Sequence, residues 1–334
     1  MTGPGRRGCL AALGTLALLL GVAGAAPAAE MVPAVLYAVG QKFDKSFNEG
    51  AHAGAERFKA DTGIGYLEFQ PQAVAEFERG VGALVRRGAT DIAVIGFYYA
   101  TPLETVAARF PQVRFTLVDA AAERPNVRSV VFREQEGTFL VGMLAALASQ
   151  TGKVGFIGAL DIPLLRRFIG GYDQGARYAR PGVAVPVAFI GTTPAAFNDP
   201  AAGAEIARSQ FEAGVDVVFA GAGSSNFGIF QQAADMHRLA IGVDSNQNYL
   251  HPGTMLTSML KRVDLAVLQA FQAAQAGSWQ PGPHRLGLAE GGLDYAVDQY
   301  NERLITSEMR AKVEQARADI IAGRIIVEDR AGQP

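Results

Sequence analysis

The chain has 334 residues, of which 49% are hydrophobic, 19% charged and 9% aromatic. A single hydrophobic core stops growing at roughly 250–300 residues, so this length and apolar content predict a globular protein with two lobes. Lysine and arginine (30 residues) nearly balance aspartate and glutamate (32 residues), which argues against nucleic-acid binding. One cysteine, Cys9, and four scattered histidines exclude a disulfide framework and form no metal-ligand pattern.

Residues 1–29 have the layout of a secretory signal peptide, with two arginines, an apolar run and then an alanine-rich stretch. The apolar run is shorter than the ~20 residues of a membrane-spanning helix, so we expect cleavage near Ala28 or Ala29 rather than a membrane anchor. Cys9 precedes the apolar run, whereas a lipid-modified cysteine stands at the cleavage point. The sequence therefore predicts a freely soluble periplasmic protein that is not a lipoprotein.

Ten short apolar runs follow the leader. They are rich in Val, Ile and Phe and do not alternate with polar residues, as expected for strands buried on both faces of a parallel sheet. The runs span residues 34–39, 64–69, 91–96, 113–119, 127–132, 153–160, 184–191, 216–221, 239–244 and 255–260. Helix starts lie between them: Ser46 and Glu49 have the spacing of a capping box, and Asp199 precedes Pro200 as a helix cap.

This alternation predicts an α/β protein with two doubly wound parallel-sheet lobes. An eight-stranded (β/α) barrel is the alternative, which the strand count alone does not dismiss. Two pairs of neighbouring runs have no room for a helix between them, which favours two lobes with chain crossings at these points. We predict a first lobe of residues 33–131 plus 257–283 and a second lobe of residues 132–256 plus 284–330, joined by three crossover segments.

Aromatic residues stand beyond several predicted strand ends. Phe43 and Phe47 lie in the polar segment after the first strand. Phe97 follows a later strand, and Phe197 precedes a helix in the second lobe. These rings either pack back onto a lobe core or face a ligand. Because ligands of α/β sheets bind outside the carboxyl ends of strands, the repeated placement favours a sandwich around a flat ring, with Asn48 supplying amide hydrogen bonds.

Charged residues occupy similar places. Asp119 and Asp244 each end a predicted strand, and Lys261 follows another. Carboxylate oxygens suit sugar hydroxyls, which are donors that need acceptors, and Lys261 suits either Asp244 or a hydroxyl. A surface salt bridge or a helix cap is an equally good explanation from spacing alone.

The turn from Gly221 to Gly228 follows a strand and opens a helix, but its third glycine is misplaced for a dinucleotide fingerprint. We expect the backbone donors of Gly223 and Ser224 to face a ligand, the alternative being a simple tight turn. The chain has no nucleophile elbow and no phosphate-binding loop, so we expect neither catalysis nor a cofactor.

These segments together resemble the basic membrane protein family of ABC transporter substrate-binding proteins, whose best-known members are purine nucleoside receptors. The resemblance extends from about residue 34 to about residue 329. The family has the type I periplasmic binding fold, with two lobes and three crossovers. The resemblance is carried by residues 44–48, 132–142, 152–156, 197–200, 242–244 and 256–264.

The resemblance implies roles for individual residues. Phe47 is similar to the ring that stacks on the nucleobase, and Asn48 to a neighbouring polar contact. The side chains of Asp119, Asp244 and Lys261 are similar to the groups that hold the ribose hydroxyls. Nucleoside receptors of the family also carry an acidic residue just after the first strand, whereas residues 37–42 here contain no carboxylate.

We therefore expect a periplasmic receptor that captures a purine nucleoside, or a similar planar ring metabolite, between two closing lobes. It is expected to be a monomer that delivers its ligand to an ABC permease, without catalysis, cofactor or nucleic acid. The alternatives are a receptor for a free nucleobase or a flavin, a partner of a chemoreceptor, and a secreted nucleoside-processing enzyme. The predicted ligand-binding residues are Phe43, Asp44, Phe47, Asn48, Phe97, Asp119, Phe197, Gly223, Ser224, Asp244 and Lys261.

Overall fold

The computed structural model of the chain describes residues 1–3, 5 and 31–332. The apolar run and the cleavage site of the predicted signal peptide lie outside these residues. Met31–Pro334 is a unit of its own, separate from Met1–Glu30. None of the described helices combines the length and hydropathy that a membrane span requires.

Five strands from the first half of this unit and one later strand form a six-stranded parallel sheet, in the order β11-β5-β4-β3-β1-β2. The central strands are apolar and buried along their length, as expected for strands covered on both faces. Its strands are β1 (Pro33–Leu36), β2 (Leu67–Phe69), β3 (Asp91–Ile95), β4 (Arg114–Val118), β5 (Val127–Phe132) and β11 (Gly282–Leu286).

A second six-stranded sheet has the order β12-β10-β9-β8-β6-β7. All its pairs are parallel except β10 with β12. Two separate sheets exclude the eight-stranded barrel and confirm the predicted fold class of two doubly wound lobes. The strands are β6 (Val154–Gly158), β7 (Val187–Phe189), β8 (Val217–Gly221), β9 (Leu239–Asp244), β10 (Met255–Lys261) and β12 (Leu293–Tyr295).

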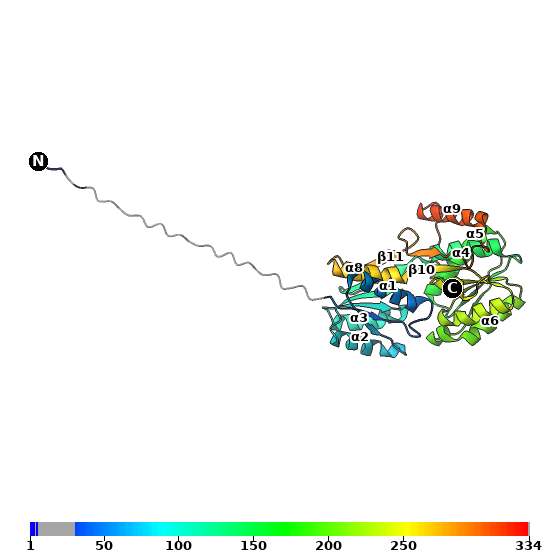
Figure 1. Cartoon of the computed structure of the whole chain (residues 1–334), viewed down its shortest axis with the longest axis horizontal. Helices are drawn as coiled ribbons and strands as arrows, with labels where there is room; N and C mark the ends of the chain where they lie inside the picture. The colour runs from blue at the N-terminus through cyan, green and yellow to red at the C-terminus, as the bar shows by residue number, and fades with distance from the viewer. Residues whose placement is uncertain (4, 6–30, 333–334) are drawn as a thin grey trace. The chain divides into compact units, whose positions relative to one another are not determined.

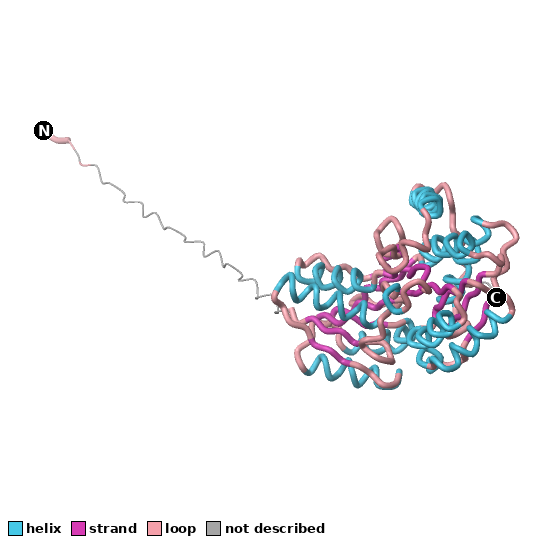
Figure 2. The backbone as a smooth tube through the Cα atoms, turned by 45° about the vertical axis from the view of Figure 1, so that its right-hand side comes forward, coloured by secondary structure: helices cyan, strands magenta, loops and turns pink. Residues whose placement is uncertain are grey.

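Helices cover both faces of each sheet. Figure 1 shows α1 and α8 together on one face of the first sheet, with α2 and α3 on the opposite face. In the second sheet α4 packs against α5, and α6 packs against α7. The tube in Figure 2 shows the strands enclosed between these helical layers. The helices are α1 (Phe47–Thr62), α2 (Phe77–Arg86), α3 (Ala100–Arg109), α4 (Glu134–Ala148), α5 (Pro163–Ala179), α6 (Pro200–Glu212), α7 (Asn226–Asp235), α8 (Val263–Gln275) and α9 (Ser307–Ile321).

We call the first sheet with α1, α2, α3 and α8 the first lobe, and the second sheet with the remaining helices the second lobe. The predicted boundaries at residues 131, 256 and 283 stay a prediction. The strand pairing nevertheless places parts of two strands, β10 and β11, in the other sheet from the one that these boundaries imply. β10 pairs with β9 and β12 through Lys261, so residues 257–261 belong to the second sheet. β11 pairs with β5 through Leu286, so residues 284–286 belong to the first sheet.

All ten predicted apolar runs contain a strand, whereas β11 and β12 were not predicted. β11 lies at the edge of its sheet, carries a proline and a histidine, and has a single buried residue, Leu286. β12 has only three residues and also lies at an edge. An edge strand does not need a continuous apolar run, so the pattern that marks a buried strand is missing from both.

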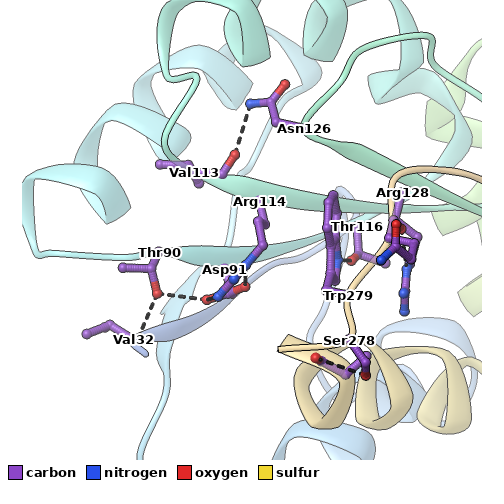
Figure 3. Close-up of polar contacts among 12 residues, drawn as sticks. Val32, Thr90, Asp91, Val113, Arg114, Thr116, Asn126, Arg128, Ser278 and Trp279 are labelled. Atoms are coloured by element: carbon purple, nitrogen blue, oxygen red, sulfur yellow. Dashed lines mark hydrogen bonds and ion pairs between the residues drawn. The ribbon is translucent and has the colours of Figure 1, made fainter. Parts of the chain in front are cut away.

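Polar contacts hold the first sheet together at the end where β1 and β3 begin (Figure 3). Thr90 Oγ1 accepts a hydrogen bond from Val32 N at 2.9 Å and donates to Asp91 at 2.7 Å. Arg114 donates to both carboxylate oxygens of Asp91, at 2.5 and 2.9 Å, and so joins β3 to β4. The sole tryptophan, Trp279, follows α8 and donates from Nε1 to Thr116 Oγ1 at 3.3 Å. The contacts of Thr90, Asp91 and Arg114 lie where these strands begin, whereas the loops described next follow the carboxyl ends of the same strands.

Candidate ligand-binding site

A cavity of about 620 Å³ is lined by residues of both lobes. Its size lies within the range of roughly 300–1,000 Å³ that is typical of small-molecule sites. The lining side chains come mainly from loops that follow the carboxyl ends of parallel strands, where α/β proteins bind ligands. Asp119 follows β4 and Phe97 follows β3 in the first lobe, whereas Asp244 and Lys261 end β9 and β10 in the second lobe.

Aromatic rings from both lobes line the cavity. Phe97 of the first lobe lies 6.4 Å from Phe197 of the second, measured between ring centroids. Phe47 begins α1, and Phe168 lies on α5 with only 3% of its surface exposed. Tyr98 also lines the cavity, and its hydroxyl accepts a hydrogen bond from Val39 N at 2.6 Å. These rings supply flat apolar walls that suit a planar ligand.

A buried lysine lies at the centre of the charged part of the site. Lys261 Nζ is 2.6 Å from Asp119 Oδ1 and 3.2 Å from Glu134 Oε1, and Glu134 in turn pairs with Arg167 at 3.0 Å. The same ammonium lies 5.5 Å from the centroid of the Phe47 ring. Because Asp119 belongs to the first lobe and Lys261 to the second, this ion pair joins the lobes. A buried cation is tolerated only with such partners.

Burial governs the protonation of this cluster. It raises the pKa of Asp119 to about 6, which Lys261 opposes and Glu134 reinforces. Burial also raises the pKa of Asp244, against the attraction of Lys261 and a hydrogen bond from Ser46. For Lys261, burial alone would lower the pKa, but Asp119, Glu134 and Asp244 outweigh it and the pKa lies above its ordinary value. Lys261 is therefore charged. Its positive charge favours the ionised forms of Asp119 and Asp244, which accept hydrogen bonds.

Backbone geometry at the two aspartates is unusual. Asp119 has φ of 77° and Asp244 has φ of 66°, both in the left-handed region that non-glycine residues rarely adopt. Such conformations cost free energy and persist where surrounding contacts hold them. At Asp244 the contacts include Ser245 N donating to Val243 O at 2.8 Å. Both carboxylates thus reach the cavity from turns whose backbone conformation is stabilised by neighbouring contacts.

Two predicted contacts have structural partners of their own. Asp44 accepts hydrogen bonds from the backbone N–H groups of Ser46, Asn48 and Glu49 at 2.9–3.1 Å, and so caps α1. Burial raises the pKa of Asp44, and these three donors oppose the rise. Asn48 Oδ1 accepts from Ala38 N at 2.9 Å, and its amide donates to Ala38 O at 3.2 Å. Both side chains line the cavity, yet their hydrogen bonds fix the loop that carries Phe47.

The structure gathers ten of the eleven predicted binding residues around this cavity. The exception is Phe43, whose ring is 56% exposed and does not line the cavity. It packs edge-on against His52 at 5.2 Å and lies 5.1 Å from the ammonium of Lys42. Phe43 therefore lies outside the cavity, because its ring packs on His52 of α1, and its contact with a ligand stays a prediction. The ten that line the cavity are Asp44, Phe47, Asn48, Phe97, Asp119, Phe197, Gly223, Ser224, Asp244 and Lys261.

The residues of the site that the sequence did not reveal include Tyr98, Glu134 and Phe168. Tyr98 stands next to Phe97, so its place in an aromatic cluster after a strand was a usable signal. Glu134 begins α4 shortly after β5, and only its contacts with Lys261 and Arg167 identify it as part of the charged cluster. Phe168 lies in the middle of α5, where its apolar ring looks like any core residue. For Glu134 and Phe168 only the tertiary structure reveals the role.

Comparison with known proteins places the whole unit in one family. The model of the PnrA-like ABC transporter substrate-binding proteins (Bmp) matches residues 31–331. A solute-binding protein of an ABC transporter system from Aeropyrum pernix has a similar structure, with a TM-score of 0.81 and 30% sequence identity. That similarity covers 90% of this chain and 94% of the other. The predicted periplasmic binding fold is thereby confirmed.

Two relatives illustrate the family. A lipoprotein of Pyrococcus furiosus is 33% identical over 274 residues, which cover 78% of this chain and 69% of the relative. The ABC transporter nucleoside-binding protein BmpA of Lactococcus lactis is 29% identical over 307 residues, which cover 85% of each chain. The similarity thus runs through both lobes rather than through one of them.

The relatives correct one prediction. The Pyrococcus furiosus protein and its counterparts in Pyrococcus abyssi and Pyrococcus horikoshii, each 32% identical over 274 residues, are named lipoproteins. A lipoprotein is held at a membrane by its lipid, so the expectation of a free periplasmic protein that is not a lipoprotein is contradicted. That expectation relied only on the position of Cys9 relative to the apolar run, which lies in the part of the chain that the structure does not describe.

The predicted resemblance to the basic membrane protein family is therefore confirmed over residues 31–331. Members of this family are the substrate-binding proteins of ABC transporters. Their role is to bind a small molecule for an ABC permease, which is not a catalytic role. The protein is a member of the PnrA-like family of ABC transporter substrate-binding proteins.

Proposed function

We propose that this protein captures a purine nucleoside, or a similar planar metabolite that carries hydroxyl groups, between its two lobes. The observation that carries the proposal is the combination, in one cavity, of aromatic walls with a buried charged cluster of Asp119, Asp244 and Lys261. A flat ring needs the first feature, and sugar hydroxyls need the second. The name of the Lactococcus lactis relative, a nucleoside-binding protein, supports the same ligand class.

The proposed ligand is held from both sides. Phe47 and Phe97 of the first lobe and Phe197 of the second offer ring faces for stacking. The carboxylates of Asp119 and Asp244 accept hydrogen bonds from hydroxyl groups, and the Lys261 ammonium donates to a hydroxyl oxygen. Since these groups lie on both lobes, a bound ligand favours the closed arrangement over the open one. The protein then delivers the intact ligand to its permease as a monomer, without chemistry of its own.

One observation favours a second candidate, another flat ligand such as a free nucleobase or a flavin. Residues 38–41, which follow β1 and line the cavity, contain no carboxylate to accept from the edge of a nucleobase. The same part of the cavity has neutral amides instead, at Gln41 and Gln72. A free nucleobase has no sugar hydroxyls for the charged cluster, and a flavin carries a ribityl chain in place of ribose, so the nucleoside is preferred.

A thermal-shift screen of the full chain tests the proposal. A ligand that binds only the folded state raises the melting temperature, so nucleosides should raise it more than nucleobases, flavins or free sugars do. Chromatography after incubation with inosine or adenosine should return the nucleoside intact. Protein-dependent release of the free base would instead assign an enzyme, and a shift with flavins alone would assign the second candidate.

A further inference from the structure

Two turns from opposite lobes meet beside the cavity. One is the turn of residues 44–47 before α1 in the first lobe, and the other is the turn of residues 243–247 after β9 in the second lobe. Ser46 Oγ lies 2.7 Å from Asp244 Oδ2, Ser245 Oγ donates to Ser46 O at 2.9 Å, and Gln247 Nε2 donates to Lys45 O at 3.1 Å. The chain itself therefore supplies hydrogen bonds that exist only when the lobes are together.

The Ser46 hydroxyl is free for this contact because another residue caps α1. Ser46 stands at the helix start, but its side chain makes no capping hydrogen bond. Asp44 accepts from the N–H groups of Asn48 and Glu49 in its place. Ser46 is fully buried, and its single proton has two acceptors in range, Asp244 Oδ2 at 2.7 Å and Val243 O at 3.1 Å. The shorter contact, to a carboxylate, takes the proton.

We propose that Ser46 is a positioning residue for ligand binding, because its hydroxyl holds the Asp244 carboxylate of the opposite lobe in the orientation in which Asp244 faces the cavity. The role deepens the proposed function above, since it assumes that Asp244 contacts the ligand. It makes the site complete only after closure: in an open arrangement Asp244 loses the donor that orients it. Ser46 thereby couples the polar end of the site to the approach of the lobes.

The charges around Asp244 give this role a specific signature. Lys261 of β10 attracts it, whereas Asp44 before α1, Glu134 of α4 and Asp119 after β4 add negative charge nearby. Burial raises the pKa of Asp244, and the Ser46 hydrogen bond works against this rise. Removing the hydroxyl should move the pKa of Asp244 further upward, so that ionised Asp244 is lost at a higher pH.

The test compares Ser46→Ala with Ser245→Ala, which also removes one interlobe hydrogen bond but none that the Asp244 carboxylate accepts. Adenosine binding to each full-length variant is measured by calorimetry between pH 5 and pH 8. Ser46→Ala should bind about tenfold more weakly at pH 8, which corresponds to about 1.4 kcal/mol. Its deficit should grow as the pH is lowered, whereas Ser245→Ala should follow the wild-type pH profile. Small-angle scattering of the ligand-free variants reports the separation of the lobes.

The outcomes distinguish the two proposals. If wild type binds adenosine and Ser46→Ala matches it in affinity and pH profile, the role of Ser46 is refuted and the proposed function stands. If Ser46→Ala and Ser245→Ala lose affinity equally at every pH, Ser46 contributes only a closing contact and the positioning role is refuted. If wild type binds no nucleoside, the proposed function fails. Scattering then decides on Ser46: a larger radius of gyration for Ser46→Ala than for Ser245→Ala supports the coupling, and equal radii refute it.

Discussion

At the scale of single residues, the chemistry of the site depends on how Lys261 is compensated. Lys261 is 3% exposed, and its ammonium group lies between the carboxylates of Asp119 and Glu134. Leaving such a charge without a partner is far more costly than leaving a surface charge, because the surrounding protein solvates it poorly. A substitution of Asp119 or Glu134 therefore affects both the fold and the site, and the pH dependence separates the two effects.

Asp119 should make stability depend on pH in a defined direction. Burial raises its pKa to about 6, above the 3.8 of an ordinary aspartate. Between about pH 4 and pH 6 the folded chain keeps a proton on Asp119 that the unfolded chain has lost, so the contribution of this group to stability falls as the pH rises. In urea denaturation of ligand-free protein, wild type should lose stability relative to Asp119→Asn over this range. A difference that is constant with pH would contradict the raised pKa.

Phe47 and Phe43 form a matched pair for testing the aromatic wall. They belong to the same segment, but Phe47 lines the cavity and Phe43 is exposed. Phe47→Ala should weaken adenosine binding by roughly 1–3 kcal/mol, the contribution of one base–aromatic stack, whereas Phe43→Ala should leave the affinity near that of wild type. Calorimetry measures both. Equal losses in the two variants, or no loss in Phe47→Ala, would remove Phe47 from the wall.

Sequence pattern could locate most of these side chains but not their orientation. The carboxyl ends of strands are readable from apolar runs, which is why Asp119, Asp244 and Lys261 were found. Whether a ring in the following loop turns inward like Phe47 or outward like Phe43 depends on tertiary packing. Ser46 shows the same limit, since the capping-box spacing predicts a bond within the helix and the hydroxyl instead reaches the other lobe.

At the scale of elements, α4 and α5 pack so closely that the glycines between them, Gly142, Gly171 and Gly175, have no room for a side chain. A Cβ atom on Gly175 would collide with the carbonyl oxygen of Phe139, and one on Gly142 with that of Tyr172. The first residue of α4 is Glu134, so this pair of helices also sets one partner of Lys261. Close packing of α4 against α5 therefore helps to fix the position of Glu134 in the charged cluster.

Gly175→Ala should destabilise the second lobe. The collision is with backbone, which cannot rotate away, and overpacking of this kind typically costs roughly 1–3 kcal/mol. Gly65→Ala is the control, because nothing lies within 4 Å of a Cβ atom added there. Urea denaturation should show a lower free energy of unfolding for Gly175→Ala and little change for Gly65→Ala. Equal stability of the two variants would mean that α4 and α5 tolerate a wider separation.

The elements that sequence reasoning missed share a physical cause. β11 and β12 lie at sheet edges, where neither length nor continuous apolar character is required, whereas every central strand was marked by a buried run. Residues 257–261 continue β10 up to Lys261, because β9 and β12 pair with it on either side.

At the scale of the whole molecule, two lobes each contribute an incomplete half of one site. Asp119, Phe47 and Phe97 come from the first lobe, and Asp244 and Lys261 from the second. Neither half could hold a ligand on all sides, so affinity and closure are linked through contacts made to both. The two-lobe architecture and the family were predictable from pattern and motif. The expectation that the protein is not a lipoprotein relied on the leader sequence, and relatives that are named lipoproteins contradict it.

The central claim is that the buried charged cluster holds the hydroxyl groups of a nucleoside. Calorimetric titration of the protein with adenosine and with 2′,3′-dideoxyadenosine tests it most directly, since the two ligands share the ring and differ in the hydroxyls. We predict one-to-one binding of adenosine and at least about tenfold weaker binding of the dideoxy compound, because hydrogen bonds to buried charged groups are then lost. Equal affinity for the two compounds, or no binding of either, would contradict the account.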